Sequence, residues 1–187
     1  QGIARLDGNT IDTTALSQGI RSLMDSDRVT GLAIAIFQGD SAAYVRTFGY
    51  ADAHERLPLH PRSNMYGASL SKAVFATLVL GLVHDGVIDL DRPLEEYLPQ
   101  PIHAYPETDK WHEDFRDLKD DTLYHRITAR MCLAHTTGFP NWRWLEADEK
   151  LRCKFVPGTR YSYSGEGLTY LQVVLERITG RNIEDLM

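Results

Sequence analysis

The sequence predicts an α/β protein of the α+β kind, with an antiparallel sheet early in the chain and mostly helices after it. Two features predict this order: paired apolar segments flank a Gly-containing turn before residue 50, and apolar residues at helical spacing predominate from residue 69 onward. The 187 residues, 43% of them hydrophobic, suffice for a sizeable core. We expect a helix and a β-hairpin over residues 1–62 and a mostly helical lobe over residues 63–187.

The N-terminal part contains one helix and two strands. Residues 10–25 place their apolar side chains on one face, which predicts an amphipathic helix. Residues 31–37 are aliphatic and residues 41–48 are rich in Tyr, Val, Thr and Phe, with Gln38-Gly39-Asp40 between them as a turn. Because a two-stranded hairpin is marginally stable alone, we expect other strands to pair with it.

Helices predominate after a polar connection over residues 49–63, which contains two prolines. The first helix is expected over residues 69–84 and ends where Gly86 can supply a left-handed cap. A short helix is expected over residues 89–99, entered through Pro93 and stopped by the proline at its end.

The rest of the chain combines one irregular segment with two helices. Residues 100–121 are the most charged and aromatic part, and we expect a long surface loop or an irregular helix there. Loops of that length are often functional. Residues 128–134 and 170–178 predict helices, the second of them capped by Gly180.

Composition excludes several classes of function. Lys and Arg number 20 against 26 Asp and Glu, and the net charge of −6 disfavours a nucleic-acid binder, which needs a basic face. The longest apolar run, residues 73–83, is shorter than the roughly 20 residues of a transmembrane segment. Cys132 and Cys153 make neither a disulfide framework nor a metal site, and two buried thiols or one disulfide are both compatible with the sequence. The dispersed histidines lack metal-site spacing, so neither a metal nor another cofactor is expected.

The sharpest chemical feature is Ser69-Leu-Ser-Lys72. A Ser and a Lys three residues apart lie on one helical face, one turn from each other. A desolvated lysine has a lowered pKa and can take the serine proton, which activates a hydroxyl that is otherwise a poor nucleophile. The simpler interpretation is a helix-capping serine beside an exposed lysine, and Ser-x-x-Lys alone is a weak pattern.

Several ordered motifs give that pattern a context. Residues 66–72 resemble the nucleophile motif of the serine β-lactamase and penicillin-binding-protein-like superfamily, especially its class C-like branch of esterases and D-aminopeptidases. The resemblance continues through residues 85–99, His135-Thr-Thr-Gly138 and residues 157–165, and it covers residues 31–180. It implies a β-lactamase/transpeptidase-like fold, in which an antiparallel sheet lobe and a helical lobe hold the site between them.

Tyr163-Ser-Gly165 resembles the family's Tyr-x-Asn motif, whose tyrosine assists proton transfer at the nucleophile. A cationic lysine nearby lowers the pKa of a tyrosine and lets it act as a base. The alternative is an aromatic core residue in a Tyr-rich turn. Gly165 departs from the motif because it has no amide to hold the lysine or a substrate carbonyl. Glu166 is a candidate replacement for that polar group.

The family's third motif, Lys-Thr-Gly or His-x-Gly on a strand beside the site, has no counterpart here. No Lys or His follows Lys154, and Ile178-Thr-Gly180 is expected at a helix end. The strands that would complete the hairpin's sheet are missing as well. One explanation covers both: the chain is the N-terminal portion of a longer protein, truncated before the later strands, and a missing C-terminal part or a second chain completes the sheet. Gln1 in place of an initiator Met agrees with a trimmed or processed chain.

The resemblance implies a serine hydrolase that acts on ester or amide carbonyls, β-lactams and peptides included, through an acyl-enzyme on Ser69. Lys72 and Tyr163 would handle the proton, with no metal or cofactor. The partner would be a small-molecule ester, amide or peptide, and the family favours a periplasmic or secreted location. The alternative is a catalytically inactive binding or scaffold domain that keeps the fold. The departure at Gly165 favours that alternative, and the intact Ser69 and Lys72 oppose it.

Other candidate residues carry less weight. His135 resembles the structural histidine of the family's His-Thr-Ser-Gly turn, for which we expect a packing and hydrogen-bonding role. The tryptophans Trp111, Trp142 and Trp144 either wall a substrate cleft or belong to the core. The sequence contains no Gly-x-Ser-x-Gly elbow, which counts against an α/β-hydrolase.

Overall fold

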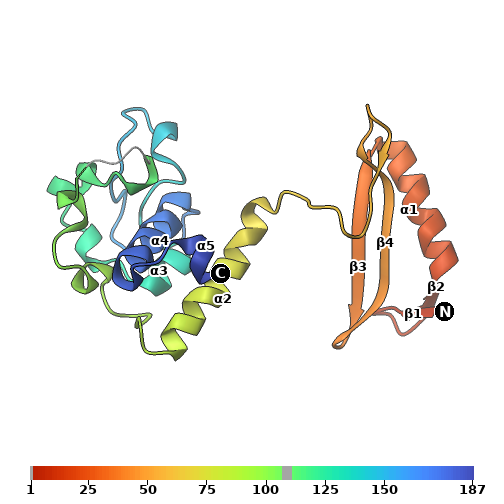
Figure 1. Ribbon diagram of the computed structural model, residues 1–187, viewed down its shortest axis with the longest axis horizontal. Helices are drawn as coiled ribbons and strands as arrows, with labels where there is room; N and C mark the ends of the chain where they lie inside the picture. The colour runs from red at the N-terminus through yellow and green to blue at the C-terminus, as the bar shows by residue number, and fades with distance from the viewer. Residues whose placement is uncertain (1, 107–110) are drawn as a thin grey trace. The chain divides into compact units, whose positions relative to one another are not determined.

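The computed structural model describes residues 2–106 and 111–187, and the chain divides into two compact units. The first unit, Gln1–Tyr66, contains the strands, and the second, Gly67–Met187, contains most of the helices (Figure 1). Ser69, Lys72 and Tyr163 all belong to the second unit. The geometry that joins them is therefore internal to one unit.

The first unit combines a helix with short strands. In chain order these are β1 (Gly2–Ala4), β2 (Thr10–Asp12), α1 (Thr13–Asp27), β3 (Gly31–Gln38), β4 (Ser41–Asp52) and β5 (Leu57–Pro58). The helix begins three residues later than predicted, because residues 10–12 pair with β1 as an antiparallel strand. Asp12 then caps the helix, and its carboxylate accepts hydrogen bonds from the N–H groups of Thr14 and Ala15. These bonds lower the pKa of Asp12.

The predicted hairpin is confirmed, and it is longer than expected. β3 and β4 pair antiparallel, β4 continues to Asp52, and β5 adds a third strand in the order β3-β4-β5. Part of the expected polar connection is therefore strand. α1 packs against this sheet (Figure 1), with Ile20 and Met24 in one apolar cluster with Tyr44 and Phe48. Removal of these side chains from water holds the helix to the sheet.

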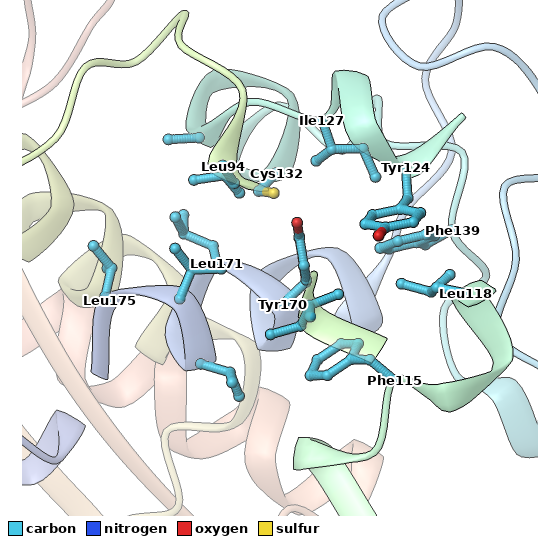
Figure 2. Packing of buried hydrophobic residues seen from close by; sticks show 14 of the residues in the cluster. Leu94, Phe115, Leu118, Tyr124, Ile127, Cys132, Phe139, Tyr170, Leu171 and Leu175 are labelled. Carbon is cyan, nitrogen blue, oxygen red and sulfur yellow. The ribbon is translucent and has the colours of Figure 1, made fainter. Parts of the chain in front are cut away.

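The second unit is helical, with short 3₁₀ turns between its α-helices. The helices are α2 (Ser71–His84), α3 (Ala129–Leu133), α4 (Gly165–Thr179) and α5 (Ile183–Leu186), and the turns are η1 (Ala68–Leu70), η2 (Leu94–Tyr97), η3 (Ile102–Ala104), η4 (Trp111–Glu113), η5 (Arg116–Asp120), η6 (Tyr124–Arg126) and η7 (Arg143–Leu145). The core of this unit forms around α4, whose Tyr170, Leu171 and Leu175 are buried among side chains from the turns (Figure 2). A packed α4 fixes the loop that precedes it, and that loop carries Tyr163.

The charged segment over residues 100–121 is more ordered than expected. In its described part, Ile102, Phe115 and Leu118 are buried, because η3 and η5 turn their apolar side chains into the core. Of the two expected alternatives, the surface loop is wrong for these residues, and the irregular helix agrees with the 3₁₀ turns η3, η4 and η5. Residues 107–110, which the same expectation included, lie outside the described part of the chain.

Several helix boundaries differ from the predicted ones. α4 begins at Gly165, five residues before the predicted start, because Ser164 caps it: its Oγ accepts the Gly167 N–H at 2.8 Å. Residues 89–99 contain the 3₁₀ turn η2 in place of an α-helix. The predicted glycine caps are confirmed, since Gly86 and Gly180 have φ of 72° and 66°.

Candidate active site

Ser69 lies in the turn η1 directly before α2, so the helix that was expected to begin at residue 69 begins two residues later. The preceding residue, Ala68, has φ 43°, a left-handed conformation that costs an L-residue about 1–2 kcal/mol. The Leu70 N–H donates to Gly67 O at 2.9 Å and closes the turn. Half of the residues of α2 are exposed, and Val79 is its one buried residue. The strained turn leaves Ser69 exposed, and nothing in the sequence signals the strain.

Two side chains converge on the Ser69 hydroxyl. The Lys72 Nζ donates a hydrogen bond to Ser69 Oγ at 3.2 Å, as expected for residues one helical turn apart. Tyr163, 94 residues away in the sequence, places its OH 2.9 Å from Ser69 Oγ. The Lys72 Nζ also lies 5.2 Å from the centre of the Tyr163 ring. The three predicted residues therefore form one hydrogen-bonded cluster.

The cluster changes the acidity of Tyr163. The hydrogen bond with Lys72, followed by that with Ser69, holds the pKa of Tyr163 below its ordinary value of 10.0. Both partners stabilise the phenolate, and the positive charge of Lys72 adds to the effect. The side chain is 38% exposed, so water screens part of this stabilisation.

His135 holds the Tyr163 loop on both sides of the tyrosine. The Ser162 N–H donates to His135 O at 2.8 Å, and the Ser164 N–H donates to His135 Nδ1 at 3.1 Å. The imidazole also packs against the Tyr163 ring, with 4.5 Å between the ring centres. Burial lowers the pKa of His135 and the charge of Lys72 adds to this effect, whereas the contact of its Nδ1 with Ser164 O at 3.2 Å acts in the opposite direction. These contacts agree with the expected packing and hydrogen-bonding role.

Gly165 stands against the face of an indole ring. A Cβ at this position would lie 2.5–2.7 Å from three atoms of the six-membered ring of Trp142, closer than real contacts allow. Trp142 in turn stacks on Trp144 at 5.0 Å between ring centres and an interplanar angle of 6°. The aromatic ring of Trp142 therefore occupies the space into which a side chain at position 165 would extend. From the sequence, Trp142 could not be told apart from Trp111 and Trp144, and the Trp111 side chain lies outside the described part.

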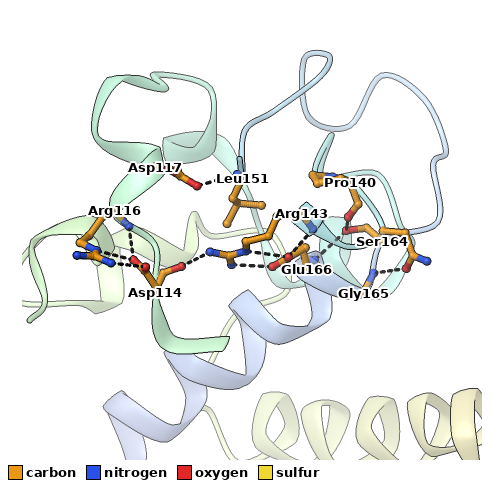
Figure 3. A network of polar contacts seen from close by, with 11 residues as sticks. Asp114, Arg116, Asp117, Pro140, Arg143, Leu151, Ser164, Gly165 and Glu166 are labelled. Atoms are coloured by element: carbon orange, nitrogen blue, oxygen red, sulfur yellow. Dashed lines mark hydrogen bonds and ion pairs between the residues drawn. The ribbon is translucent and has the colours of Figure 1, made fainter. Parts of the chain in front are cut away.

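Glu166 does not replace the missing polar group, so that suggestion is wrong. Its side chain is completely buried and forms a two-pronged ion pair with Arg143, whose Nε and Nη2 donate at 2.9 and 2.8 Å (Figure 3). The Arg143 N–H donates to the same carboxylate, and the Arg143 side chain also donates to Asp114 O. All of the carboxylate's contacts are thus structural: they tie η7 to the start of α4.

The other candidate ligands form no metal site. Among the residues described, no group of His, Cys, Asp and Glu is arranged to hold a metal ion. Cys132 is buried and Cys153 is half-buried, and both are free thiols in the structure. In the described part of the chain, no helix is both long enough and apolar enough to cross a membrane.

Comparison with known proteins decides the family. The model of a family described as Beta-lactamase matches residues 16–187. The chain belongs to the β-lactamase family. This β-lactamase-family chain is 25% identical over 202 residues to the esterase EstB of Burkholderia gladioli, and the match covers 92% of the chain and 48% of the esterase. It is 26% identical over 178 residues to a D-aminopeptidase of Cereibacter sphaeroides, covering 95% of the chain and 34% of that protein.

The fold comparison agrees with the resemblance in the sequence. The octameric penicillin-binding protein homologue from Pyrococcus abyssi matches with a TM-score of 0.67 and 21% identity, over 94% of this chain and 41% of that one. The β-lactamase and penicillin-binding-protein fold is therefore confirmed. The β-lactamase-family chain spans between about a third and a half of the length of these relatives.

Proposed function

We propose that this chain carries the nucleophile and the proton-transfer groups of a serine hydrolase that acts on ester or amide carbonyls. The observation that carries the proposal is the convergence of Lys72 and Tyr163 on Ser69 Oγ at 3.2 and 2.9 Å. The names of the relatives, an esterase and a D-aminopeptidase, support this class of reaction. Because the chain spans only part of those relatives, the proposal concerns the protein encoded by the complete reading frame.

The hydrogen bonds at Ser69 Oγ support a role for each residue. The ammonium of Lys72 has no acceptor lone pair, so it donates to Ser69 Oγ. The single hydrogen of the Ser69 hydroxyl is then available for the oxygen of Tyr163. Since the pKa of Tyr163 is lowered, its phenolate can accept that proton as Ser69 attacks.

The reaction then proceeds in two steps, acylation of Ser69 and hydrolysis of the acyl-enzyme. Ser69 Oγ bonds to the carbonyl carbon, its proton passes to Tyr163, and Tyr163 returns that proton to the departing alcohol or amine. In the second half, water bonds to the acyl carbon and gives a proton to Tyr163, and the bond from that carbon to Ser69 Oγ breaks. Tyr163 passes the proton to Oγ, which restores the serine and releases the acid. The backbone N–H of Ser69 is the expected donor to the carbonyl oxygen as negative charge develops there.

A kinetic comparison of single variants tests these roles. Ser69→Ala, Lys72→Met and Tyr163→Phe are each expected to lower kcat for p-nitrophenyl ester hydrolysis at least a hundredfold, the scale of a lost nucleophile or base. Ser41→Ala and Tyr161→Phe are matched controls, because both residues are exposed and neither belongs to the cluster. Equal rates for Ser69→Ala and the unmodified protein would overturn the proposal.

The alternative is a catalytically inactive binding or scaffold domain. Gly165 favours it, since the position lacks a polar side chain. A fluorescent acylating probe separates the two functions: a hydrolase takes the label at Ser69 and Ser69→Ala does not, whereas an inactive domain shows equal background labelling in both.

A further inference from the structure

His135 connects the end of α3 to the loop that carries Tyr163. Its carbonyl oxygen accepts the Ser162 N–H at 2.8 Å, and its Nδ1 accepts the Ser164 N–H at 3.1 Å. The second of these N–H groups belongs to the planar peptide that joins Tyr163 to Ser164, so its direction fixes the backbone immediately after the tyrosine. The position of the Tyr163 OH at Ser69 Oγ therefore depends on Nδ1 as a hydrogen-bond acceptor.

The backbone of His135 is strained. Its φ is 55°, at the first position after Ala134, the C-cap of α3. Glycine or asparagine usually occupies such a position, and the left-handed conformation costs another L-residue about 1–2 kcal/mol. A residue that brings this strain with it points to a role for its side chain.

Protonation would change what Nδ1 can do. This nitrogen faces both backbone groups of Ser164, the N–H at 3.1 Å and the carbonyl oxygen at 3.2 Å. A neutral imidazole with a bare Nδ1 accepts the N–H, whereas both nitrogens of an imidazolium carry hydrogen and only donate. The carbonyl of Ser164, the N-cap of α4, already accepts the first hydrogen bond of that helix, so a second donor adds little. Protonation therefore removes one bond without an equal replacement.

The lost bond would leave a buried donor beside the base. Ser164 is completely buried, and a buried N–H without an acceptor costs about 1–3 kcal/mol. If the peptide between Tyr163 and Ser164 turns toward another acceptor, that cost is relieved and Tyr163 moves with it. The contact of its OH with Ser69 Oγ is then lost.

The groups around the imidazole favour its neutral form. Of the charged groups in the described part of the chain, Lys72 on α2 acts on the ring, and its positive charge opposes protonation. The rings of Tyr161 and Tyr163 pack against the imidazole with 6.0 and 4.5 Å between ring centres. A charge on His135 would favour the phenolate of Tyr163, but a phenolate displaced from Ser69 Oγ cannot take its proton. His135 is half-buried, so protons from water reach it.

We propose that His135 is a positioning residue that gates the site by its protonation: the neutral imidazole holds Tyr163 at Ser69, and the imidazolium releases it. The inference rests on the proposed hydrolase function and names a regulation of the same site. The charge of a histidine ordinarily changes between about pH 5 and 8, so mild acidification would close the gate.

The test is the slope of the pH–rate profile for p-nitrophenyl ester hydrolysis by the protein from the complete reading frame. Loss of the Tyr163 phenolate alone lowers kcat/KM about tenfold for each pH unit below the pKa of that tyrosine. Protonation of His135 adds a second step, so below its pKa the decrease should steepen to about a hundredfold per pH unit. Because burial lowers the pKa of His135 from 6.5, the steeper part should begin below pH 6.5.

Three variants locate the second step. His135→Asn offers an amide oxygen as the acceptor, tolerates the left-handed backbone and binds no proton in this range, so its profile should keep the one-proton slope. His135→Ala has no acceptor and should lower kcat/KM about tenfold or more at neutral pH, a larger loss than in His135→Asn. His54→Asn is the matched control, because His54 is an exposed histidine of the first unit, and its profile should keep both steps.

Far-UV circular dichroism at each pH separates the gate from unfolding. The unmodified protein should keep its spectrum where the slope steepens, and its activity should return at neutral pH. Unfolding in that range, a one-proton slope in the unmodified protein or a two-proton slope in His135→Asn would each overturn the inference, while Ser69-dependent hydrolysis would stand. If Ser69→Ala hydrolyses the ester as fast as the unmodified protein, the proposed function fails and the inference fails with it.

Discussion

The Tyr163 OH lies 2.9 Å from Ser69 Oγ, although 94 residues separate the two in the chain. This contact depends on the loop before α4, where His135 accepts hydrogen bonds from the residues on both sides of Tyr163.

The first prediction concerns the acidity of Tyr163. Its hydrogen bond with Lys72 is the leading cause of its lowered pKa, so Lys72→Met should raise that pKa toward 10.0. As the phenolate is the proposed base, the pH at which ester hydrolysis reaches half its alkaline plateau should move upward in Lys72→Met. A pH–rate profile of kcat/KM measures this shift. An unchanged midpoint would show that the profile follows the titration of a group other than Tyr163. The part of the profile that depends on Tyr163 should disappear in Tyr163→Phe.

The second prediction concerns the pH dependence of stability. The pKa of His135 is lowered from 6.5, mainly by burial, so the unfolded chain binds this proton more readily than the folded chain. The contribution of neutral His135 to stability is thus complete above about pH 6.5 and declines as the pH falls through that value toward the folded pKa. Urea unfolding at about pH 7.5 and 5.5 should show a larger loss for the unmodified protein than for His135→Asn. Equal losses would contradict the assignment.

Asn suits this comparison because His135 has φ 55°, in the left-handed region that Asn tolerates better than most residues. A variant that strains the backbone would lower stability at every pH. Only the change in unfolding free energy between the two pH values reports the titration of His135.

The third prediction compares two ion pairs. Glu166 is fully buried and the Arg143 side chain is 13% exposed, so Arg143→Met leaves an uncompensated buried carboxylate and should cost about 3–5 kcal/mol of unfolding free energy. Arg152→Met is the matched control, because the Arg152–Asp148 pair is exposed and should contribute little to the unfolding free energy. Denaturant midpoints measure both. Similar losses of unfolding free energy in the two variants would show that breaking the buried Glu166–Arg143 pair costs no more than breaking an exposed pair.

The fourth prediction concerns amide-bearing substrates. Gly165 supplies no side-chain amide, and a substrate amide left without a partner in a closed site costs about 1–3 kcal/mol. We therefore expect the protein to hydrolyse small activated esters more readily than β-lactams. Rates for a p-nitrophenyl ester and a chromogenic β-lactam at equal concentration decide the matter, and faster turnover of the β-lactam would reverse the expected order.

Local patterns predicted much of the fold. The β-favouring residue types of β3 and β4, the turn between these strands and the Gly180 cap of α4 each depend on a few neighbouring residues, and all appear as expected. The sequence did not reveal that residues 10–12 form a strand, because that pairing is made with β1, outside the segment itself. Nor did it reveal burial at Phe115 and Leu118, since long-range packing overrides the polar composition around them.

In the candidate site, too, local contacts could be predicted from the sequence and long-range ones could not. Ser69 and Lys72 are one helical turn apart, so their contact could be predicted from spacing, and a family motif pointed to Tyr163. The left-handed backbone at Ala68 could not be anticipated, because alanine is not a residue that favours it. The contact of Trp142 with Gly165 joins two loops 23 positions apart, and only the folded chain shows that the glycine accommodates the ring.

The most direct test of the central claim is the chemical identity of the acylated residue. The protein from the complete reading frame is mixed with an excess of an activated ester, quenched in acid and digested, and the acyl group is located by mass spectrometry. We expect the acyl mass on Ser69, its loss in Ser69→Ala, and weaker labelling in Tyr163→Phe. An acyl group on another residue, or equal labelling in Ser69→Ala, would contradict it.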